Sequence, residues 1–355
     1  MTRILQVILL PVSLCYGLAM QIRNLLFDLH VLPSRSFNKP VISVGNLTYG
    51  GTGKTPHIEY LIRLLTPKMF AATLSRGYGR ESNGFILASK RSNVKYIGDE
   101  PLQFLKKFEG IKVAVDEKRS RGIQTLLEKY PDLHVILLDD AFQHRYVKPG
   151  LSILLTDYHR PYTEDMILPS GTLREFSAGA SRADIIIVTK TPKIFSPITR
   201  RRIIEDMKPK PRQRVYFSYI KYTDPVPVFD TPDLVFPAKA TNILLFTGIA
   251  NDYPLREHLE RMCSELVVMK FADHHPYTLK NVEEIIRKFT DLPTQRKIIV
   301  TTEKDVMRLK TPELSTYLKN LPLFCVPMEI DFHGTDKENF DNEIIRYVEK
   351  NQGNH

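Results

Sequence analysis

Three glycines, a lysine and two threonines make up the six-residue segment GGTGKT, which begins at Gly50. Glycines at this spacing leave backbone N–H groups uncovered, so that these groups can turn towards an anion. Lys54 can reach the terminal phosphates of a nucleotide, and the Thr55 hydroxyl can ligate Mg2+. Thr48 replaces the first glycine of the usual motif, but the order of strand, turn and helix is kept. We therefore predict a nucleotide-phosphate loop formed by Thr48, Tyr49, Gly50, Gly51, Thr52, Gly53, Lys54 and Thr55.

Two adjacent acids, Asp139 and Asp140, follow the apolar run HVILL. A phosphate loop needs a carboxylate that positions its metal ion, and this carboxylate usually follows a neighbouring strand. An acid at the carboxyl end of a buried strand reaches the sheet edge where ligands bind. The alternative is two surface acids in a turn. The favoured interpretation assigns Asp139 and Asp140, together with Thr55, to a Mg2+ site.

Short apolar runs alternate with helical patterns through the first half of the chain. The runs lack in-out alternation, which is typical of strands buried on both faces of a parallel sheet. Strand and helix in repetition predict an α/β fold, here a P-loop NTPase-like, doubly wound and mainly parallel sheet. The expected strands are 40–46, 70–75, 111–116, 134–140, 151–157 and 183–190, and the expected helices are 55–65 and 117–130.

Prolines and basic residues accumulate between residues 190 and 233, which indicates a domain boundary. A second, smaller α/β pattern follows. Its expected strands are 242–250, 265–271, 296–305 and 322–330, and its expected helices are 254–263 and 279–289. A last helix, at about 339–350, is expected to pack back on the first domain.

The composition limits the classes of partner and compartment. A length of 355 residues suits about two domains, and a hydrophobic content of 43% suits packed cores. The three cysteines lie far apart, which indicates a reduced protein without a disulfide framework or zinc site. The net charge of +10 favours an anionic partner. Nine Lys and Arg residues between Lys190 and Arg214 are interpreted as a solvated helix face and linker, and nucleic acid is not expected.

Residues 4–20 contain no charged side chain, with Arg3 before them and Arg23 after them. The run is shorter than the roughly 20 apolar residues that span a bilayer, and Pro11 interrupts it. It fits a cleaved signal peptide, an ordinary core helix, or an amphipathic helix at the cytoplasmic membrane interface. A signal peptide would place the phosphate loop in a compartment without ATP. The interfacial helix, or a shallow anchor, is therefore favoured.

Seven short motifs occur in one order along nearly the whole chain, and together they are highly specific. By these motifs the sequence resembles the tetraacyldisaccharide 4'-kinases, the lipid A 4'-kinases of Gram-negative bacteria. The motifs are GNLTYGGTGKTP from Gly45, LSRGYGR from Leu74, GDEP from Gly98, LLDDAFQH from Leu137, GTLRE from Gly171, FADHH from Phe271 and TTEKD from Thr301.

The resemblance implies a reaction, a place in the cell and a domain layout. The γ-phosphate of ATP would be transferred to the 4'-hydroxyl of a tetraacyldisaccharide 1-phosphate at the cytoplasmic face of the inner membrane. Residues 1–30 would form a membrane-interface helix and 31–213 the P-loop kinase domain. Residues 214–334 would form a smaller α/β domain joined by a two-stranded hinge, and 335–355 a helix that returns to the first domain.

The resemblance also implies roles for individual residues. Lys54 would be the catalytic lysine of the phosphate loop, and Asp99 and His274 would form an acid/base pair. Glu175, in the LRE motif, would join Asp139 and Asp140 at the metal site. Apart from the resemblance, the planar guanidinium groups of Arg76, Arg80 and Arg174 suit phosphate oxygens, either of ATP or of the lipid. These three arginines are expected to bind the substrate together with Gln143 and His144.

The residues themselves leave alternatives open. Asp99 could cap a helix that begins near Pro101, and the His274–His275 pair could be a polar turn, with His275 the second choice for catalysis. Each arginine could be an ordinary surface residue. The chain departs from the family pattern at Ala141 and at Phe176, where no functional group is lost, and in the segment TGIAND, whose role the resemblance leaves open.

A competing function is a membrane-associated P-loop ATPase or GTPase switch without a small-molecule acceptor. It would share the phosphate loop and Asp139. A GTPase would also need a base-reading N-K-x-D motif, for which VTKTP at 188–192 is a poor substitute. A switch gives no reason for an acid/base pair drawn from two domains. The kinase is therefore the favoured interpretation.

Overall fold

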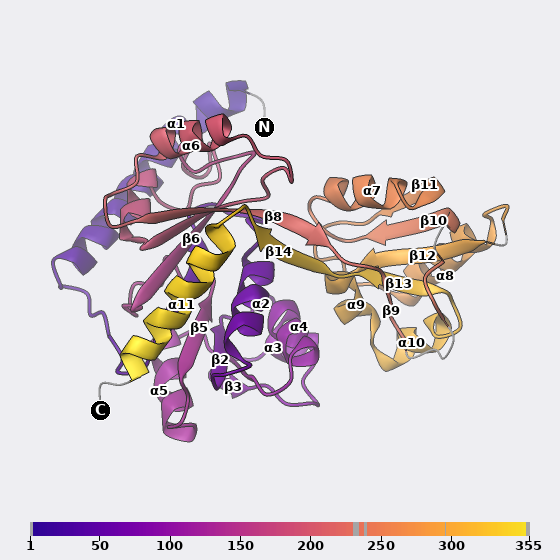
Figure 1. Cartoon of the computed structure of the whole chain (residues 1–355), viewed down its shortest axis with the longest axis horizontal. Helices are drawn as coiled ribbons and strands as arrows, with labels where there is room; N and C mark the ends of the chain where they lie inside the picture. Colours follow the sequence, from indigo (N-terminus) through magenta and orange to yellow (C-terminus); the bar gives the residue numbers. More distant parts are fainter. Residues whose placement is uncertain (1–2, 230–233, 238–239, 295, 353–355) are drawn as a thin grey trace. The chain divides into compact units, whose positions relative to one another are not determined.

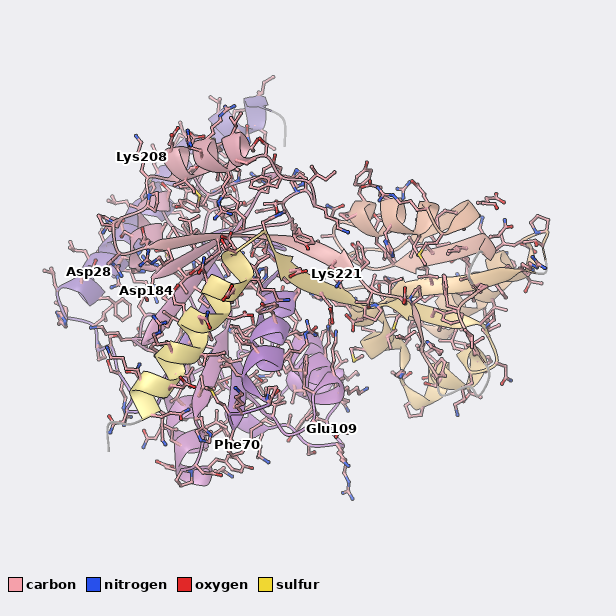
Figure 2. The ribbon with its side chains drawn as sticks, in the orientation of Figure 1. Asp28, Phe70, Glu109, Asp184, Lys208 and Lys221 are labelled. Carbon is pink, nitrogen blue, oxygen red and sulfur yellow. The ribbon has the colours of Figure 1, made fainter. Side chains whose placement is uncertain are left out.

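The computed structural model describes residues 3–229, 234–237, 240–294 and 296–352. The chain forms two compact units (Figure 1). The larger unit comprises Met1–Ile220 and Ile330–His355, and the smaller unit comprises Lys221–Glu329. Lys221, labelled in Figure 2, is the first residue of the smaller unit. The chain passes from one unit to the other within two strands, β8 (Arg214–Tyr222) and β14 (Met328–Phe332).

The larger unit is built on a sheet of nine strands within the described residues. Six neighbouring pairs between β8 and β4 are parallel, and the short edge strand β3 is antiparallel to β4. This confirms the predicted doubly wound, mainly parallel sheet. In spatial order the strands are β14, β8, β7 (Ile185–Thr189), β6 (Leu151–Asp157), β1 (Val41–Asn46), β5 (Val135–Asp139), β2 (Ala71–Ser75), β4 (Lys112–Val115) and β3 (Ile86–Leu87).

Helices cover both faces of this sheet. On one face the core joins strand residues to side chains of α2 (Lys54–Leu65), α4 (Asp99–Lys107) and α11 (Asp336–Gln352). Figure 1 shows α11, in yellow, lying across the sheet. The other face is covered by α5 (Arg119–Lys129), by the 3-10 helix η1 (Ser177–Arg182) and by α6 (Pro197–Met207). The short helix α3 (Val94–Ile97) precedes α4.

The smaller unit has a five-stranded sheet within the described residues, with two hydrophobic clusters. Three neighbouring strand pairs are parallel, and β9 is antiparallel to β13. The spatial order is β11 (Cys263–Lys270), β10 (Ala240–Thr247), β12 (Lys297–Thr302), β13 (Leu323–Val326) and β9 (Val226–Pro227). The helices are α7 (Tyr253–Glu260), α8 (Leu279–Thr290), α9 (Glu303–Leu309) and α10 (Pro312–Leu318).

Most predicted elements are confirmed, and the differences have local causes. The predicted strand 322–330 is two strands separated by Pro327, which has no N–H for a ladder. The predicted strand 296–305 ends at Thr302, whose side chain accepts from the backbone N–H of Asp305 and starts helix α9. The helix predicted over 254–263 ends at Glu260, and Cys263 begins β11.

Helix α1 (Arg3–Asp28) is continuous through Pro11 and presents its apolar side outwards. Its buried stripe is small or polar over most of its length and consists of Ser13, Gly17, Asn24 and Phe27. A Cβ atom at Gly17 would come within 2.5 Å of the Phe176 ring, so glycine permits the close approach there. The interpretation of this segment as an ordinary core helix is therefore wrong. The large apolar side chains exposed on α1 are Ile4, Leu5, Val7, Ile8, Leu10, Val12, Leu14, Tyr16, Leu18, Ile22 and Leu25.

Candidate active site

The GGTGKT segment forms an open loop between β1 and α2, as expected of a phosphate loop. Gly53 occupies the N-cap position of α2 with a φ of 85°, a left-handed conformation that favours glycine. A Cβ atom at Gly50 or Gly51 would meet no other atom within 4 Å, so internal packing does not require glycine there. The glycines instead leave space beside the backbone N–H groups. This space suits the oxygens of a phosphate.

Lys54 is directed to the acids at the end of β5. Its Nζ atom lies 3.6 Å from an Asp140 carboxylate oxygen and 3.4 Å from Asn46 Oδ1. Asn46, the last residue of β1, also donates to the Gly50 carbonyl at 3.1 Å and so fixes the loop. Asn46 was not among the predicted site residues, although it stands at the carboxyl end of a buried strand, where ligands of such sheets bind.

The Thr55 hydroxyl donates to Glu100 Oε1 at 2.7 Å. Glu100 lies in the first turn of α4, immediately after Asp99. Glu100 was not among the predicted site residues, because the GDEP motif holds two adjacent acids, Asp99 and Glu100, and the sequence does not show the direction of either side chain. The structure therefore adds a carboxylate to the neighbourhood of the Thr55 hydroxyl.

Asp139 is the buried acid of the site, with a relative exposure of 1%. Burial raises the pKa of its carboxyl group to about 8, helped by the nearby charges of Glu100 and Asp140 and opposed by Lys54 and Arg119. Its Oδ1 atom is buried and has no hydrogen-bond partner among the described residues. A buried carboxylate oxygen without a partner is costly unless a cation or donor completes it.

Asp140 differs from Asp139 because two cations lie beside it. Burial alone would raise its pKa, but Lys54 and Arg174 outweigh burial and the pKa is lowered. The Arg174 guanidinium lies 3.1 Å from Asp140 Oδ1. Asp140 also has a φ of 47°, so the backbone turns sharply directly after β5.

These groups fit a magnesium ion. Mg2+ prefers oxygen ligands and is usually held by one or two carboxylates together with water and substrate phosphates. Asp139 offers an unpartnered oxygen, the charges of Asp140 and Glu100 act on its carboxyl group, and the Thr55 hydroxyl is hydrogen-bonded to Glu100. No cluster of three or more His, Cys, Asp or Glu side chains able to hold a metal occurs among the described residues.

Glu175, predicted to join the metal site, has other partners. It is buried, and its carboxylate accepts from Asn24 at 2.7 Å, from Arg182 at 2.7 Å and from Gln143 at 3.2 Å. These bonds tie the LRE segment to α1 and η1. Because donors already satisfy this carboxylate, we leave Glu175 out of the proposed metal site.

The predicted substrate-binding residues do not all lie beside the phosphate loop. Arg174 and Gln143 lie beside the phosphate loop, since Gln143 Nε2 donates to the Asn46 carbonyl at 2.8 Å and the Arg174 guanidinium lies over the Tyr49 ring. Arg80 is buried and paired with Glu117 at 2.7 Å, which gives it a structural role in its loop. Arg76 is exposed.

A group of cations surrounds His144. Burial and the charges of Arg119, Arg23 and Arg76 lower the pKa of His144 to about 4, so that its ring is neutral at neutral pH. Its Nε2 atom is buried without a hydrogen-bond partner among the described residues. Arg119, also buried, was missed by sequence analysis because it follows no motif and reaches the site from the first residue of α5. The surrounding positive charge suits an anionic group of a ligand.

Asp99 and His274 are placed in different units. Asp99 is half-buried at the first position of α4, and Gly98 rather than Asp99 is the N-cap, so the interpretation of Asp99 as a helix cap is wrong. His274 lies in the loop that follows β11, with Nδ1 3.1 Å from Arg308 Nη2. His275 stacks on Phe271 and has Nε2 3.1 Å from Asn281 Oδ1. The packing of His275 favours a structural role for it.

Comparisons with known proteins agree with this geometry. The family described as tetraacyldisaccharide-1-P 4'-kinase matches residues 5–349. The tetraacyldisaccharide 4'-kinase of Bacteroides thetaiotaomicron is 46% identical, over 98% of this chain and 94% of its own length. That of Flavobacterium johnsoniae is 45% identical, over 98% of both chains. The crystal structure of LpxK from Aquifex aeolicus in complex with ATP is similar with a TM-score of 0.73 at 27% identity, over 97% of this chain and 99% of that one.

Proposed function

The chain belongs to the tetraacyldisaccharide 4'-kinase family, and on that premise we propose which of its residues perform the reaction. The protein is an ATP-dependent kinase that transfers the γ-phosphate of ATP to the 4'-hydroxyl of a tetraacyldisaccharide 1-phosphate in lipid A biosynthesis, with ATP and Mg2+ as cofactors. Our assignment of residues depends mainly on one observation. Lys54, Thr55 and the unpartnered Asp139 oxygen lie at the same edge of the sheet.

In this proposal the phosphate loop holds the triphosphate through its backbone N–H groups and through Lys54. Thr55, Asp139 and Asp140 would hold Mg2+, which would compensate the negative charge of the phosphates during the transfer. Arg174 and Gln143 orient the acceptor sugar or a phosphate beside the loop, since arginine's planar fork matches phosphate oxygens. Phosphoryl transfer asks mainly for such alignment and charge compensation.

We assign the acceptor's proton chemistry to Asp99, in the larger unit, and His274, in the smaller. A sugar hydroxyl is a poor nucleophile, and a positioned acid/base group contributes roughly 10²–10⁴-fold to such reactions. Both connections between the units, β8 and β14, are strands, and we keep a two-stranded hinge as part of the proposal.

Replacing Asp99 or His274 by alanine is expected to lower kcat by about a hundredfold or more while the KM for ATP changes little. Neither residue belongs to the phosphate loop, so nucleotide binding is retained. Steady-state kinetics with the acylated disaccharide measure this, and Asp132→Ala, at an exposed acid, is the matched control. Near-normal kcat in both active-site variants would remove this pair from the mechanism.

We propose that α1 places the enzyme at the cytoplasmic face of the inner membrane. Of the helices in the described residues, α1 alone is long and apolar enough to cross a membrane, and only 11% of its most apolar window is buried. The outward apolar side and the lipid nature of the substrate support interfacial contact. The cytoplasmic face is proposed because the enzyme uses ATP, which is found in the cytoplasm.

Replacing Ile8 and Leu18 of α1 together by serine is expected to lower vesicle binding by about tenfold or more, because each buried aliphatic side chain contributes about 1.5–3 kcal/mol. Both side chains are exposed, at 65% and 60%, so the thermal stability should not change. Flotation with phospholipid vesicles measures the binding. Tyr317→Ser, at an exposed position of the smaller unit, is the control. Unchanged flotation of the α1 variant would contradict this placement.

The competing function, a P-loop switch or motor without an acceptor, is not favoured, because the relatives named as kinases match over nearly their whole length. Acceptor-dependent turnover distinguishes the two functions. A kinase should release ADP rapidly only when the acylated disaccharide is present. Equal ADP release with and without this acceptor would instead favour the ATPase.

A further inference from the structure

We propose that Arg308 is a positioning residue that fixes the ring tautomer of His274, so that His274 can donate a hydrogen bond in the reaction but cannot accept the substrate's proton. The inference rests on the proposed function in one respect, namely that His274 takes part in the transfer. It goes beyond that function by stating which ring nitrogen carries hydrogen and which side chain determines this.

The tautomer of His274 follows from a hydrogen bond between its ring and the Arg308 guanidinium. Arg308 Nη2 lies 3.1 Å from His274 Nδ1. A guanidinium has only N–H donors and remains charged in proteins, so Nδ1 must offer its lone pair. A neutral imidazole that accepts at Nδ1 carries its hydrogen on Nε2. The ring therefore presents an N–H donor, and no free lone pair, at its other edge.

Arg308 is itself held rigidly. It is buried, with Nη1 3.3 Å from an Asp305 carboxylate oxygen and 3.3 Å from the Gly248 carbonyl. Asp305 is fully buried and also accepts from the Thr302 hydroxyl at 2.6 Å and from the Tyr277 hydroxyl at 3.1 Å. Such a network leaves the guanidinium little freedom to leave Nδ1.

The backbone of the histidine is fixed to the same network. The His274 N–H donates to the Gly248 carbonyl at 3.1 Å, and Gly248 N donates to Asp305 at 3.1 Å. His274 has a φ of 57°, in the left-handed region that residues other than glycine rarely adopt. The side chain is 43% exposed, so its outer edge can be reached by a ligand.

In the reaction, Asp99 and His274 would therefore have different roles: Asp99 accepts the proton, and His274 donates a hydrogen bond. When the acceptor oxygen bonds to the γ-phosphorus and the bond to the β-phosphate oxygen breaks, ADP leaves with the electron pair. The hydroxyl proton then goes to the Asp99 carboxylate, because the lone pair of His274 is already engaged by Arg308. The Nε2–H of His274 is left to donate a hydrogen bond to an anionic oxygen of the reacting groups.

The direct test is NMR of the full-length protein with 15N-labelled histidine, in which the signals of His274 are assigned by their loss in His274→Ala. We expect Nε2 to be protonated and Nδ1 to be a hydrogen-bonded acceptor at the pH where the enzyme is active. A ring with hydrogen on Nδ1 would overturn the inference. The proposed function is tested separately by the kinetics of His274→Ala.

Kinetics provide a second, independent test. His274→Gln keeps an N–H donor but cannot take up a proton, so we expect its kcat to exceed that of His274→Ala by about tenfold, and equal losses would contradict the inference. Arg308→Met should lower kcat about tenfold in the wild-type background but less than twofold in His274→Ala, because the two residues act as one unit. An equal tenfold loss in both backgrounds would show that Arg308 does not act through His274.

Two further variants separate positioning from folding. Arg308→Gln, which retains an N–H donor, should recover part of the activity lost in Arg308→Met. Arg287→Met, at an exposed arginine of α8 in the same unit, should leave kcat unchanged. Suppose that the two Arg308 variants unfold at the same temperature and yet have the same kcat. Hydrogen-bond donation to His274 Nδ1 would then not explain the role of Arg308, and the inference would be contradicted.

Discussion

Asp139→Asn is expected to lower phosphate transfer by about a thousandfold and at the same time to stabilise the protein against heat. The loss arises because asparagine is neutral and binds Mg2+ weakly, so the charge that develops on the phosphates is less well compensated. Removing such preorganised stabilisation costs on the order of 10²–10³ in kcat. Kinetics at saturating Mg-ATP measure the loss, and a kcat within tenfold of the wild type would contradict the role of Asp139.

The gain in stability follows from the pKa of Asp139. Burial raises this pKa from 3.8 to about 8. Between these two values the folded state binds more protons than the unfolded state, so this group makes the protein less stable as the pH rises through that window. Asparagine does not ionise and escapes this penalty. The stability advantage of Asp139→Asn should therefore grow from pH 5 to pH 8 and level off above pH 8.

Thermal unfolding in EDTA measures this advantage, because chelation removes the contribution of bound metal. We expect Asp139→Asn to raise the unfolding temperature at pH 8 by about 5 °C, and less at pH 5. Asp132→Asn, at an exposed acid, should change the unfolding temperature by no more than about 1 °C at either pH. A variant that is less stable than the wild type at pH 8 would mean that the buried Asp139 charge is already compensated in the Mg-free protein.

The second large effect is expected for Lys54→Met, which should reduce kcat by about a thousandfold. Lys54 is only 12% exposed, and its ammonium group lies between Asn46 and Asp140 at the mouth of the phosphate loop. In this partly water-excluded place a positive charge stabilises the transferring phosphoryl group more strongly than it would in water. Methionine preserves much of the side-chain volume, so the fold should be retained.

Comparing the kcat of Lys54→Arg with that of Lys54→Met shows whether a positive charge at this position is sufficient for phosphate transfer. Arginine keeps the charge but places it on a larger planar group, so we expect little recovery. Both variants should keep the unfolding temperature of the wild type. Full activity of Lys54→Met would show that the phosphate loop does not hold the transferred group.

The parts of the site that follow directly from the sequence are those at the ends of buried strands. Asp139 and Asp140 follow an unbroken apolar run, and GGTGKT follows another, so a parallel sheet must bring them to the same edge. The pairing of Val44 in β1 with Asp139 in β5 shows this register. The fold class could be predicted for the same reason, since strand and helix alternate regularly.

Other parts depend on side-chain directions that no local pattern reveals. Glu100 reaches the Thr55 hydroxyl only because α4 begins at Asp99, and Arg119 reaches the acids from a different helix. Strand β8 was not predicted because it lies in a basic, proline-rich stretch that reads as a linker. Arg308 was missed because its importance comes from a contact with a loop more than thirty residues away in the sequence.

The account's central claim is that the loop around Lys54 holds ATP whose terminal phosphate passes to a lipid-linked sugar. Its most direct test is incubation of the purified protein with Mg-ATP and the acylated disaccharide 1-phosphate, followed by mass spectrometry of the lipid. We expect a product heavier by one phosphate, located at the 4' position, and almost none with Lys54→Met. An unchanged lipid accompanied by ADP release from the wild-type protein would contradict the claim.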